Sequence, residues 1–386
     1  MKSLYSFIIL LFSISISISA QDKPEVNVGG VLRFNYNNST WKETHQNTGG
    51  EFGYDMFAIK PTASYKGIGL DAEVRFYSQG FGGIFVKQGW FDYDFSEKDQ
   101  MQLGLTQVPF GITTYNSHNW FFSINYYVGL EDDHDMGLKF THDDERWTYN
   151  FAFFKNAEEL DFGGNSDISN SRYAYDVGSM DENGDGTLQY RNKEVNQLNA
   201  KILRKLGRED FTHSIGLSGL FGGLYNLDTK STGNHYAVAF HYEVNYKKWN
   251  LKAQASHYKK SPNAPDGERT DVVALTAYGA PYLVASEAST YTLGLSFTQP
   301  VEWGPISSLE FYNDFGIVDK TEASFYDSYQ NVTGCLITAG LMYIYVDGAL
   351  GKNQPWIDPN FNTALAYGTE DADWHMRFNI NFGFYY

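Results

Sequence analysis

Apolar and polar side chains alternate along much of this chain, which is the pattern of β-strands lying between two environments. The stretch WHMRFNINFGFYY, residues 374–386, has Trp, Met, Phe, Ile or Tyr at every second position, with mostly polar residues between them. Similar alternation begins near residues 26, 57, 68, 101, 136, 147, 211, 236, 249 and 291. Helical spacing is nowhere sustained, so the pattern predicts an all-β fold.

Short and long connections alternate between these predicted strands. The short ones are residues 66–67, 96–98, 143–145, 207–210, 247–248 and 300–305. The others are mostly long and polar and comprise residues 39–52, 109–133, 155–193, 260–287, 318–330 and 350–373, with shorter ones at 79–84 and 226–234. This sorting is typical of a transmembrane antiparallel β-barrel with short periplasmic turns and long extracellular loops. A soluble lectin-like sandwich, which would stay in solution without detergent, has no reason to sort its loops in this way.

The number of strands follows from parity, because a barrel with both termini at the periplasmic end needs an even number. Assigning strands to residues 332–338 and 341–349 brings the total to about sixteen. Residues 271–286 are assigned to a long outer loop; counting them as a strand pair would give about eighteen. Lipid cannot satisfy bare backbone N–H and C=O groups, so the last strand is expected to pair with the first.

A girdle of aromatic residues is expected beside the short turns and at the C-terminus. Its members are Tyr65, Phe95, Trp147, Phe211, Trp249, Trp303, Tyr385 and Tyr386. A terminal strand that ends in an aromatic residue also resembles the signal that the outer-membrane barrel-assembly machinery recognises. These features predict a protein of the outer membrane of a Gram-negative bacterium.

Residues 1–20 match a secretory signal peptide, because Lys2 precedes an apolar stretch and small residues flank the cleavage point after Ala20. Residues 21–386 are expected to form one barrel domain. The composition agrees with such a barrel, since aromatic residues reach 17% while the mean hydropathy is only -0.41. The single cysteine, Cys335, excludes an internal disulfide, and the net charge of -17 argues against nucleic acid as a partner.

Residues 90–112, WFDYDFSEKDQMQLGLTQVPFGI, contain a strand, a short acidic turn and a Pro-Phe-Gly element. Together with YIYVDGALGKNQP, residues 343–355, and the aromatic final strand, they resemble the phosphate-selective porin O/P-like family. The resemblance spans most of the mature chain. It implies a passive diffusion channel of about sixteen strands, assembled as a homotrimer, with the loop after Gly111 folding inward to narrow the pore. Its other partners would be outer-membrane lipid and small polar solutes.

The expected constriction loop departs from the phosphate-selective members, which carry arginines and lysines there. Residues 110–134 contain no Lys or Arg and end in three consecutive acids before a histidine. Phosphate selectivity is therefore not carried over. Aromatic residues of this loop either offer flat surfaces to sugar rings or wedge the loop against the barrel wall. The residues expected at the constriction are Tyr115, His118, Trp120, Glu131, Asp132 and Asp133.

Charged residues on the polar side of the alternation are expected to line the pore. They are Arg33, Lys60, Asp71, Glu73, Arg75, Lys139, Lys201, Glu243, Lys252, Glu310 and Arg377. A mixed lumen is typical of a general pore whose sign preference is set locally at the constriction. The acids at the end of the constriction loop then predict a weak cation preference, or a neutral solute such as a sugar.

Residues 181–192, DENGDGTLQYRN, match the start of an EF-hand-type calcium loop. Asn192 stands where a bidentate Glu belongs, and the same composition is common in solvated loop tips. A bound Ca²⁺ would order this extracellular loop. Its candidate ligands are Asp181, Asn183, Asp185, Thr187 and Gln189.

No catalytic residue or redox cofactor is predicted. The strand histidines His213, His235, His241 and His257 accompany no Gly-x-Ser-x-Gly elbow and no His-Glu-x-x-His motif. The predicted function is a water-filled channel for passive diffusion of small polar solutes or ions. The alternative is a non-conducting outer-membrane barrel that acts as an adhesin or as a structural or recognition protein.

Overall fold

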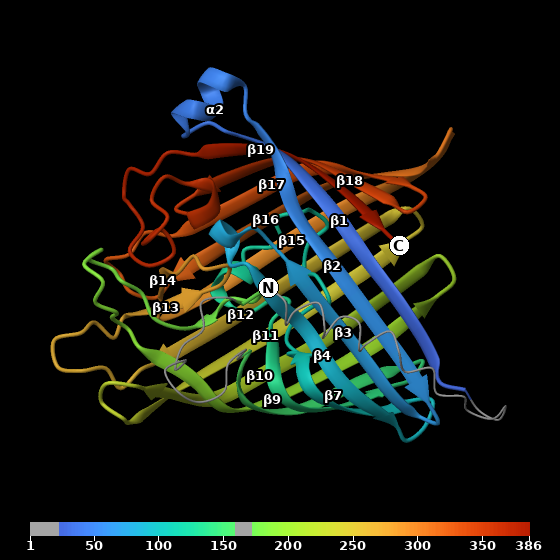
Figure 1. Cartoon of the computed structure of the whole chain (residues 1–386), viewed down its shortest axis with the longest axis horizontal. Helices are drawn as coiled ribbons and strands as arrows, with labels where there is room; N and C mark the ends of the chain where they lie inside the picture. The colour runs from blue at the N-terminus through green and yellow to red at the C-terminus, as the bar shows by residue number, and fades with distance from the viewer. Residues whose placement is uncertain (1–22, 159–171) are drawn as a thin grey trace, which may run out of the picture.

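Sixteen antiparallel strands form one closed barrel, as predicted (Figure 1). The computed structural model describes residues 23–158 and 172–386. The predicted signal peptide and the middle of the predicted 155–193 loop lie outside the described residues. The wall strands are β1 (Glu25–Ser39), β2 (Glu51–Tyr65), β3 (Ile68–Phe76), β4 (Ile84–Asp94), β5 (Asp99–Gln107), β6 (His134–Asp143), β7 (Trp147–Ala157), β9 (Asn192–Arg208), β10 (Phe211–Asn226), β11 (Thr232–Tyr246), β12 (Trp249–Ser261), β15 (Glu287–Trp303), β16 (Ile306–Lys320), β17 (Ser328–Ala339), β18 (Met342–Lys352) and β19 (His375–Tyr385).

The barrel closes where its last strand pairs with its first. β19 runs antiparallel to β1, with Val31 opposite Tyr385 at one end and Ser39 opposite Arg377 at the other. The C-terminus lies at the end of the barrel with the short turns, whereas the long loops gather at the opposite end (Figure 1). This pairing confirms the predicted closure and leaves no sheet edge exposed to lipid.

Exposed apolar and buried polar side chains alternate along the wall. In β9, Leu198 and Ile202 are 59% and 40% exposed on the outer face. Between and beside them, Gln197, Asn199 and Lys201 are 3%, 4% and 6% exposed on the inner face. The same alternation in strand after strand gives the barrel an apolar outer band and a polar interior, which is the arrangement that lipid requires.

Most aromatic residues predicted to flank the short turns are exposed there, including Phe95 and Trp303 at 60% and 63%. Tyr385 was predicted for the outer girdle, and this prediction was wrong. Its ring lies on the inner face and borders a lumen cavity. Only one of two consecutive strand residues can face lipid, and Tyr386 is the exposed one.

Residues 271–286 differ from the outer loop that was predicted. They contain β13 (Val272–Thr276) and β14 (Tyr282–Ala285), which form a separate three-stranded sheet with β8 (Asp176–Val177). β13 and β14 are entirely buried, and Tyr258 on β12 donates its hydroxyl to Ala285 O at 3.0 Å. The continuous apolar run therefore marks strands packed against the inner face of the wall, and the number of wall strands stays at sixteen.

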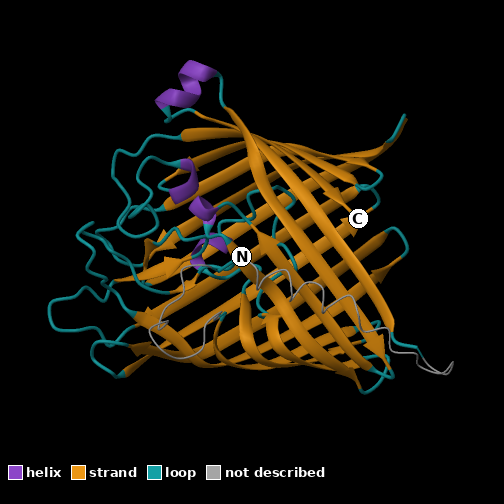
Figure 2. Ribbon diagram, in the orientation of Figure 1, coloured by secondary structure: helices purple, strands orange, loops and turns teal. Residues whose placement is uncertain are grey.

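The helical segments are short and belong to the connections (Figure 2). Within the described ranges, no helix combines the length and apolarity that crossing a bilayer would require. α2 follows β1 and projects outward from the barrel wall at the top of the picture (Figure 1). The segments are α2 (Glu43–Thr48), η1 (Gln79–Phe81), η2 (Tyr126–Val128) and η3 (Pro355–Ile357).

Candidate functional site

The loop between β5 and β6, residues 108–133, folds into the barrel and crosses its lumen. Ile112 N donates to Gln254 Oε1 on β12 at 2.9 Å. Farther around the wall, Gln330 on β17 donates through Nε2 to Phe122 O at 2.9 Å. Since β12 and β17 are both remote from β5 in the strand order, the loop spans the interior, as the family resemblance implied.

Asp314 on β16 accepts three hydrogen bonds from the tip of this constriction loop. Its Oδ2 accepts from His118 N at 2.8 Å and from Asn119 Nδ2 at 2.7 Å, and its Oδ1 lies 2.7 Å from His118 Nδ1. On the other side of the imidazole ring, Asn250 Oδ1 is 2.6 Å from His118 Nε2. The predicted constriction residue His118 is therefore fixed between β12 and β16, with Asp314 only 6% exposed.

Three lysines predicted to line the pore bind the constriction loop or its base. Because each side chain donates to the chain that enters the lumen, it stabilises the inward fold. The acceptors are Gln107 O for Lys139 (2.9 Å), Thr113 Oγ1 for Lys201 (2.8 Å), and Tyr115 O and Ser117 O for Lys252 (2.9 and 3.0 Å).

Glu131 holds the two halves of the constriction loop together. Its carboxylate accepts from Asn116 N at 2.8 Å and from Ser123 N at 3.0 Å. Burial is the main cause that raises the pKa of Glu131 to about 7, and the hydrogen bonds from Ser123 and Asn116 oppose it. The side chain is 4% exposed, so it supports the loop from within.

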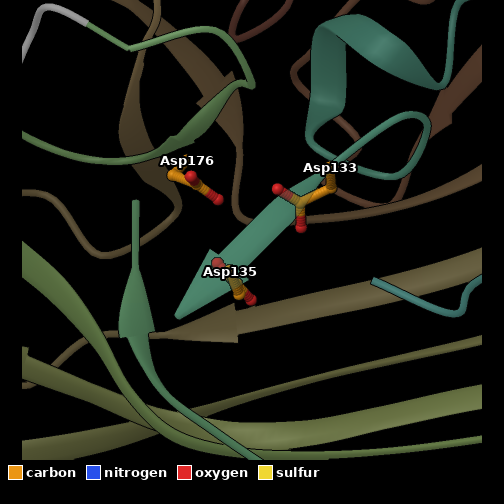
Figure 3. A group of neighbouring side chains, drawn as sticks. All are labelled: Asp133, Asp135 and Asp176. Carbon is orange, nitrogen blue, oxygen red and sulfur yellow. The ribbon is translucent and has the colours of Figure 1, made fainter. Parts of the chain in front are cut away.

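Asp132 and Asp133 are likewise turned away from open water. Asp132 Oδ2 is 2.9 Å from Lys87 Nζ and accepts from the Tyr173 hydroxyl at 2.6 Å. Asp133 lies beside two further aspartates (Figure 3). The acids expected to set the sign of the constriction are thus buried in its support, and the premise of the predicted cation preference is not met.

A lumen cavity of about 240 Å³ lies against the constriction loop. Its charged lining consists of Arg33, Arg75, Arg377 and Asp55. The rest is mainly aromatic and includes three residues predicted at the constriction, Tyr115, His118 and Trp120. The cavity walls therefore present guanidinium groups and aromatic faces.

Two of the three arginines are paired with carboxylates. Arg33 Nε is 2.7 Å from Asp55 Oδ2, and the Arg33 guanidinium lies 4.3 Å from the centre of the Trp120 ring. Arg75 shares Glu73 with Lys60: the distances from the Glu73 oxygens are 2.5 Å to Arg75 Nε and 2.9 Å to Lys60 Nζ. Two cations, Lys60 and Arg75, share the one carboxylate of Glu73, so this group has a net charge of one positive unit.

Arg377 on β19 differs from the other two arginines. Its Nε donates to Asn37 Oδ1 at 2.9 Å, and its guanidinium lies 5.5 Å from the centre of the Phe121 ring. Among the described residues no carboxylate forms an ion pair with it. An arginine held by a neutral amide and an aromatic ring keeps donors for an anionic group.

The remaining predicted pore-lining acids lie on the inner face, close in sequence to the short turns. Asp71 accepts from Gln88 Nε2 at 2.7 Å, and Glu243 accepts from Asn250 Nδ2 at 3.1 Å. Glu310 is partly buried on β16. These acids therefore line the periplasmic part of the lumen rather than its constriction.

Sequence reasoning missed Asp55 and Lys87, and both occupy β-bulges. The register between β1 and β2 shifts so that Asp55 is an extra residue opposite Arg33 and Phe34. A second shift, between β3 and β4, leaves Lys87 without an opposite residue on β3. A bulge turns inward a side chain that strict alternation places outside. The residues next to these two positions contain no sequence pattern that marks a bulge.

The predicted calcium loop is largely exposed, and its polar groups bond one another. Asp181 accepts from Asp185 N at 3.2 Å and from Gly186 N at 2.7 Å. Gln189 Oε1 accepts from Glu182 N at 2.9 Å. These bonds shape a tight turn with or without an ion, so calcium binding by Asp181, Asn183, Asp185, Thr187 and Gln189 stays a prediction.

Three solved structures show the same architecture. The outer-membrane channel DcaP of Acinetobacter baumannii aligns with a TM-score of 0.59 at 10% identity, covering 94% of this chain and 97% of that one. The anion-selective porin from Comamonas acidovorans gives 0.59 at 11% identity, with 94% and 100% covered. The trimer form of OmpT from Vibrio cholerae gives 0.50 at 12% identity, with 95% and 100% covered. The fold is that of an outer-membrane porin. No protein-family model and no curated protein sequence matches the chain.

Proposed function

We propose that this protein is a porin of the Gram-negative outer membrane, through which small polar solutes diffuse down their gradients. The observation that carries the proposal is the combination of a closed barrel, an apolar outer band and a loop folded across a polar lumen. A wall with an apolar outer band is stable only in lipid, and a polar lumen is stable only when it is filled with water. The proposal includes no catalytic chemistry and no redox cofactor.

We further propose that the constriction weakly prefers anions. Arg377 faces the cavity without a carboxylate partner among the described residues, and the Lys60–Glu73–Arg75 group carries one excess positive charge. Charges near a narrow passage determine the sign preference of a pore. This geometry favours anions over the cations predicted from the sequence. Phosphate selectivity is not part of the proposal.

Planar-bilayer recording tests both levels of the proposal. Purified protein should give stepwise conductance, and a salt gradient should give a reversal potential of the anion-selective sign. R377Q should move that potential towards the cation side, whereas R208Q, at the exposed end of β9, should leave it unchanged. Absence of conductance from folded barrels would favour the alternative of an adhesin or structural barrel. Conductance with cation selectivity would refute the anion preference alone.

We also propose that the protein assembles as a homotrimer. The similar OmpT structure is described as a trimer, and the family resemblance implies the same assembly. Light scattering of the detergent-solubilised protein, with the detergent mass subtracted, should give three chains per particle. A single chain per particle would exclude the trimer without affecting the channel.

A further inference from the structure

Three buried aspartates from separate elements meet behind the constriction loop (Figure 3). Asp133 ends that loop, Asp135 lies at the start of β6, and Asp176 belongs to β8 of the inner sheet. One carboxylate oxygen from each lies within 4.8 Å of the other two. The residues are 7%, 1% and 2% exposed, respectively. Bulk water therefore does little to screen the three carboxylates from one another.

The charges around this cluster, here called the aspartate triad, do not balance. Glu158 and Glu194 lie nearby and are 0% and 6% exposed. The ion pairs of the surrounding described residues bring in two permanent cations: Arg172, 3.6 Å from Asp176 Oδ2, and Lys260, 3.3 Å from Glu194 Oε1. His235 Nδ1 lies 3.9 Å from Glu194 Oε1 and adds a charge only when the ring is protonated. Five carboxylates thus share two cations. Buried charges that remain unpaired cost several kcal/mol each, so the structure calls for additional positive charge or for protons.

Independent of this charge count, the site contains buried oxygen atoms with no hydrogen-bond donor among the described residues. They include Asp133 Oδ1, Asp135 Oδ1 and Glu158 Oε2. The second oxygen of Asp135 accepts from Gln197 Nε2 at 3.0 Å, and that of Glu158 accepts from Ala174 N at 3.0 Å. Asp135 and Glu158 are therefore each oriented through one oxygen and present the other. Ligands of metal ions are commonly oriented in this manner.

We propose that the aspartate triad binds a divalent metal ion, Ca²⁺, behind the constriction loop. The donors are carboxylate oxygens only, which suit hard cations and give soft or nitrogen-preferring metals no advantage. Ca²⁺ tolerates irregular geometry and completes its shell with water and backbone carbonyl groups. Its two charges would reduce the excess of three negative charges to one.

The ion would link elements that are remote in sequence. Asp133 belongs to the loop that crosses the lumen, Asp135 to the wall, and Asp176 to the small sheet packed inside it. Binding would therefore fasten the loop and the inner sheet to β6 together. This site is separate from the exposed turn that contains Asp181 and Asp185, so the two can be tested against each other.

Calcium uptake by the full barrel in detergent tests the proposal. After removal of metal with a chelator, the protein is dialysed against CaCl₂, and bound calcium is measured by elemental analysis and titration calorimetry. Wild type should bind one Ca²⁺ per chain at the triad. D135N and D176N should weaken that binding by about 100-fold or more, since loss even of an outer-sphere group costs 10- to 100-fold. D185N in the exposed turn and D266N in an outer loop are the matched controls and should bind as wild type does.

The remaining outcomes would overturn the proposal. If wild type takes up no calcium at millimolar concentration, the carboxyl groups are held by shared protons instead. Loss of binding in D185N with retention in D135N would assign the ion to the exposed turn. The thermal unfolding temperature, measured with and without Ca²⁺, shows that each variant is folded. It should rise with Ca²⁺ in wild type and in D185N but not in D135N.

Discussion

Replacing Asp314 with alanine should release the tip of the constriction loop. The substitution removes the acceptor of three hydrogen bonds, from His118 N, His118 Nδ1 and Asn119 Nδ2, at 2.7 to 2.8 Å. Hydrogen bonds to a charged group contribute about 1.5–3 kcal/mol each. Water in the lumen can form hydrogen bonds with the donors that Asp314 leaves, so the expected net loss of free energy holding the loop tip is about 3–4 kcal/mol.

This loss corresponds to about a 100- to 1,000-fold change in the local opening equilibrium, because about 1.4 kcal/mol is a factor of ten. Hydrogen exchange measured by mass spectrometry reports that equilibrium directly. The backbone amide of His118 should exchange faster by this factor in D314A, while amides in β16 and its neighbours stay protected. The barrel itself should unfold at nearly the wild-type temperature, since its wall hydrogen bonds are unchanged.

Asp319 offers a matched control on the same strand. It is exposed beyond the region of loop contact, so D319N removes a negative charge from β16 without removing a loop anchor. Equal exchange of His118 in D314A and wild type would refute the view that Asp314 holds the loop. Equal acceleration in D314A and D319N would show that net charge, rather than these hydrogen bonds, determines loop position.

Three further predictions concern the support of the loop and the outer wall. K87M leaves the buried Asp132 carboxylate without its cation, so the free energy of unfolding should fall by about 3–5 kcal/mol and the urea midpoint should fall with it. K98M, in an exposed turn, should leave the midpoint unchanged. The pKa of Glu131 is raised from 4.5 to about 7 in the folded protein. Because the folded state binds this proton more tightly than the unfolded state, protonation of Glu131 stabilises the fold at low pH, and this stabilisation is lost as pH rises through about 7. Loop amides, corrected for intrinsic exchange, should therefore open more at pH 8 than at pH 6, and E131Q should abolish this difference. L217R on the lipid face, where Leu217 is 58% exposed, should cost up to about 2–4 kcal/mol in vesicles; an unchanged midpoint would contradict a lipid-facing position.

The wall was predictable because one physical rule governs nearly all of it. Side chains of a membrane barrel alternate between lipid and water, and closure requires an even number of strands with the last beside the first. The inner sheet was missed because β13 carries a continuous apolar run. Such a run does not alternate, so it was placed in a loop although it forms a buried strand.

The site was less predictable, for two physical reasons. Asp55 and Lys87 lie at bulges, which reverse the inside and outside faces without a clear mark in the sequence. The acids of the constriction loop were identified correctly as its last residues, but their orientation depends on partners far along the chain, such as Lys87 and Tyr173. The predicted cation preference therefore rested on acids whose burial the sequence does not reveal, whereas the proposed anion preference rests on the arginines that line the lumen cavity.

The pairing of β1 with β19 has a consequence for biogenesis. Gly30 N donates to Tyr386 O at 2.8 Å across this seam, so the hydrogen bonds that complete the cylinder join segments at nearly opposite ends of the described chain. A chain interrupted late in synthesis would present two unpaired strands to the bilayer and could not be sealed by any internal rearrangement. Closure thus depends on β19: a polypeptide that lacks residues 375–385 could not bring a strand against the free edge of β1.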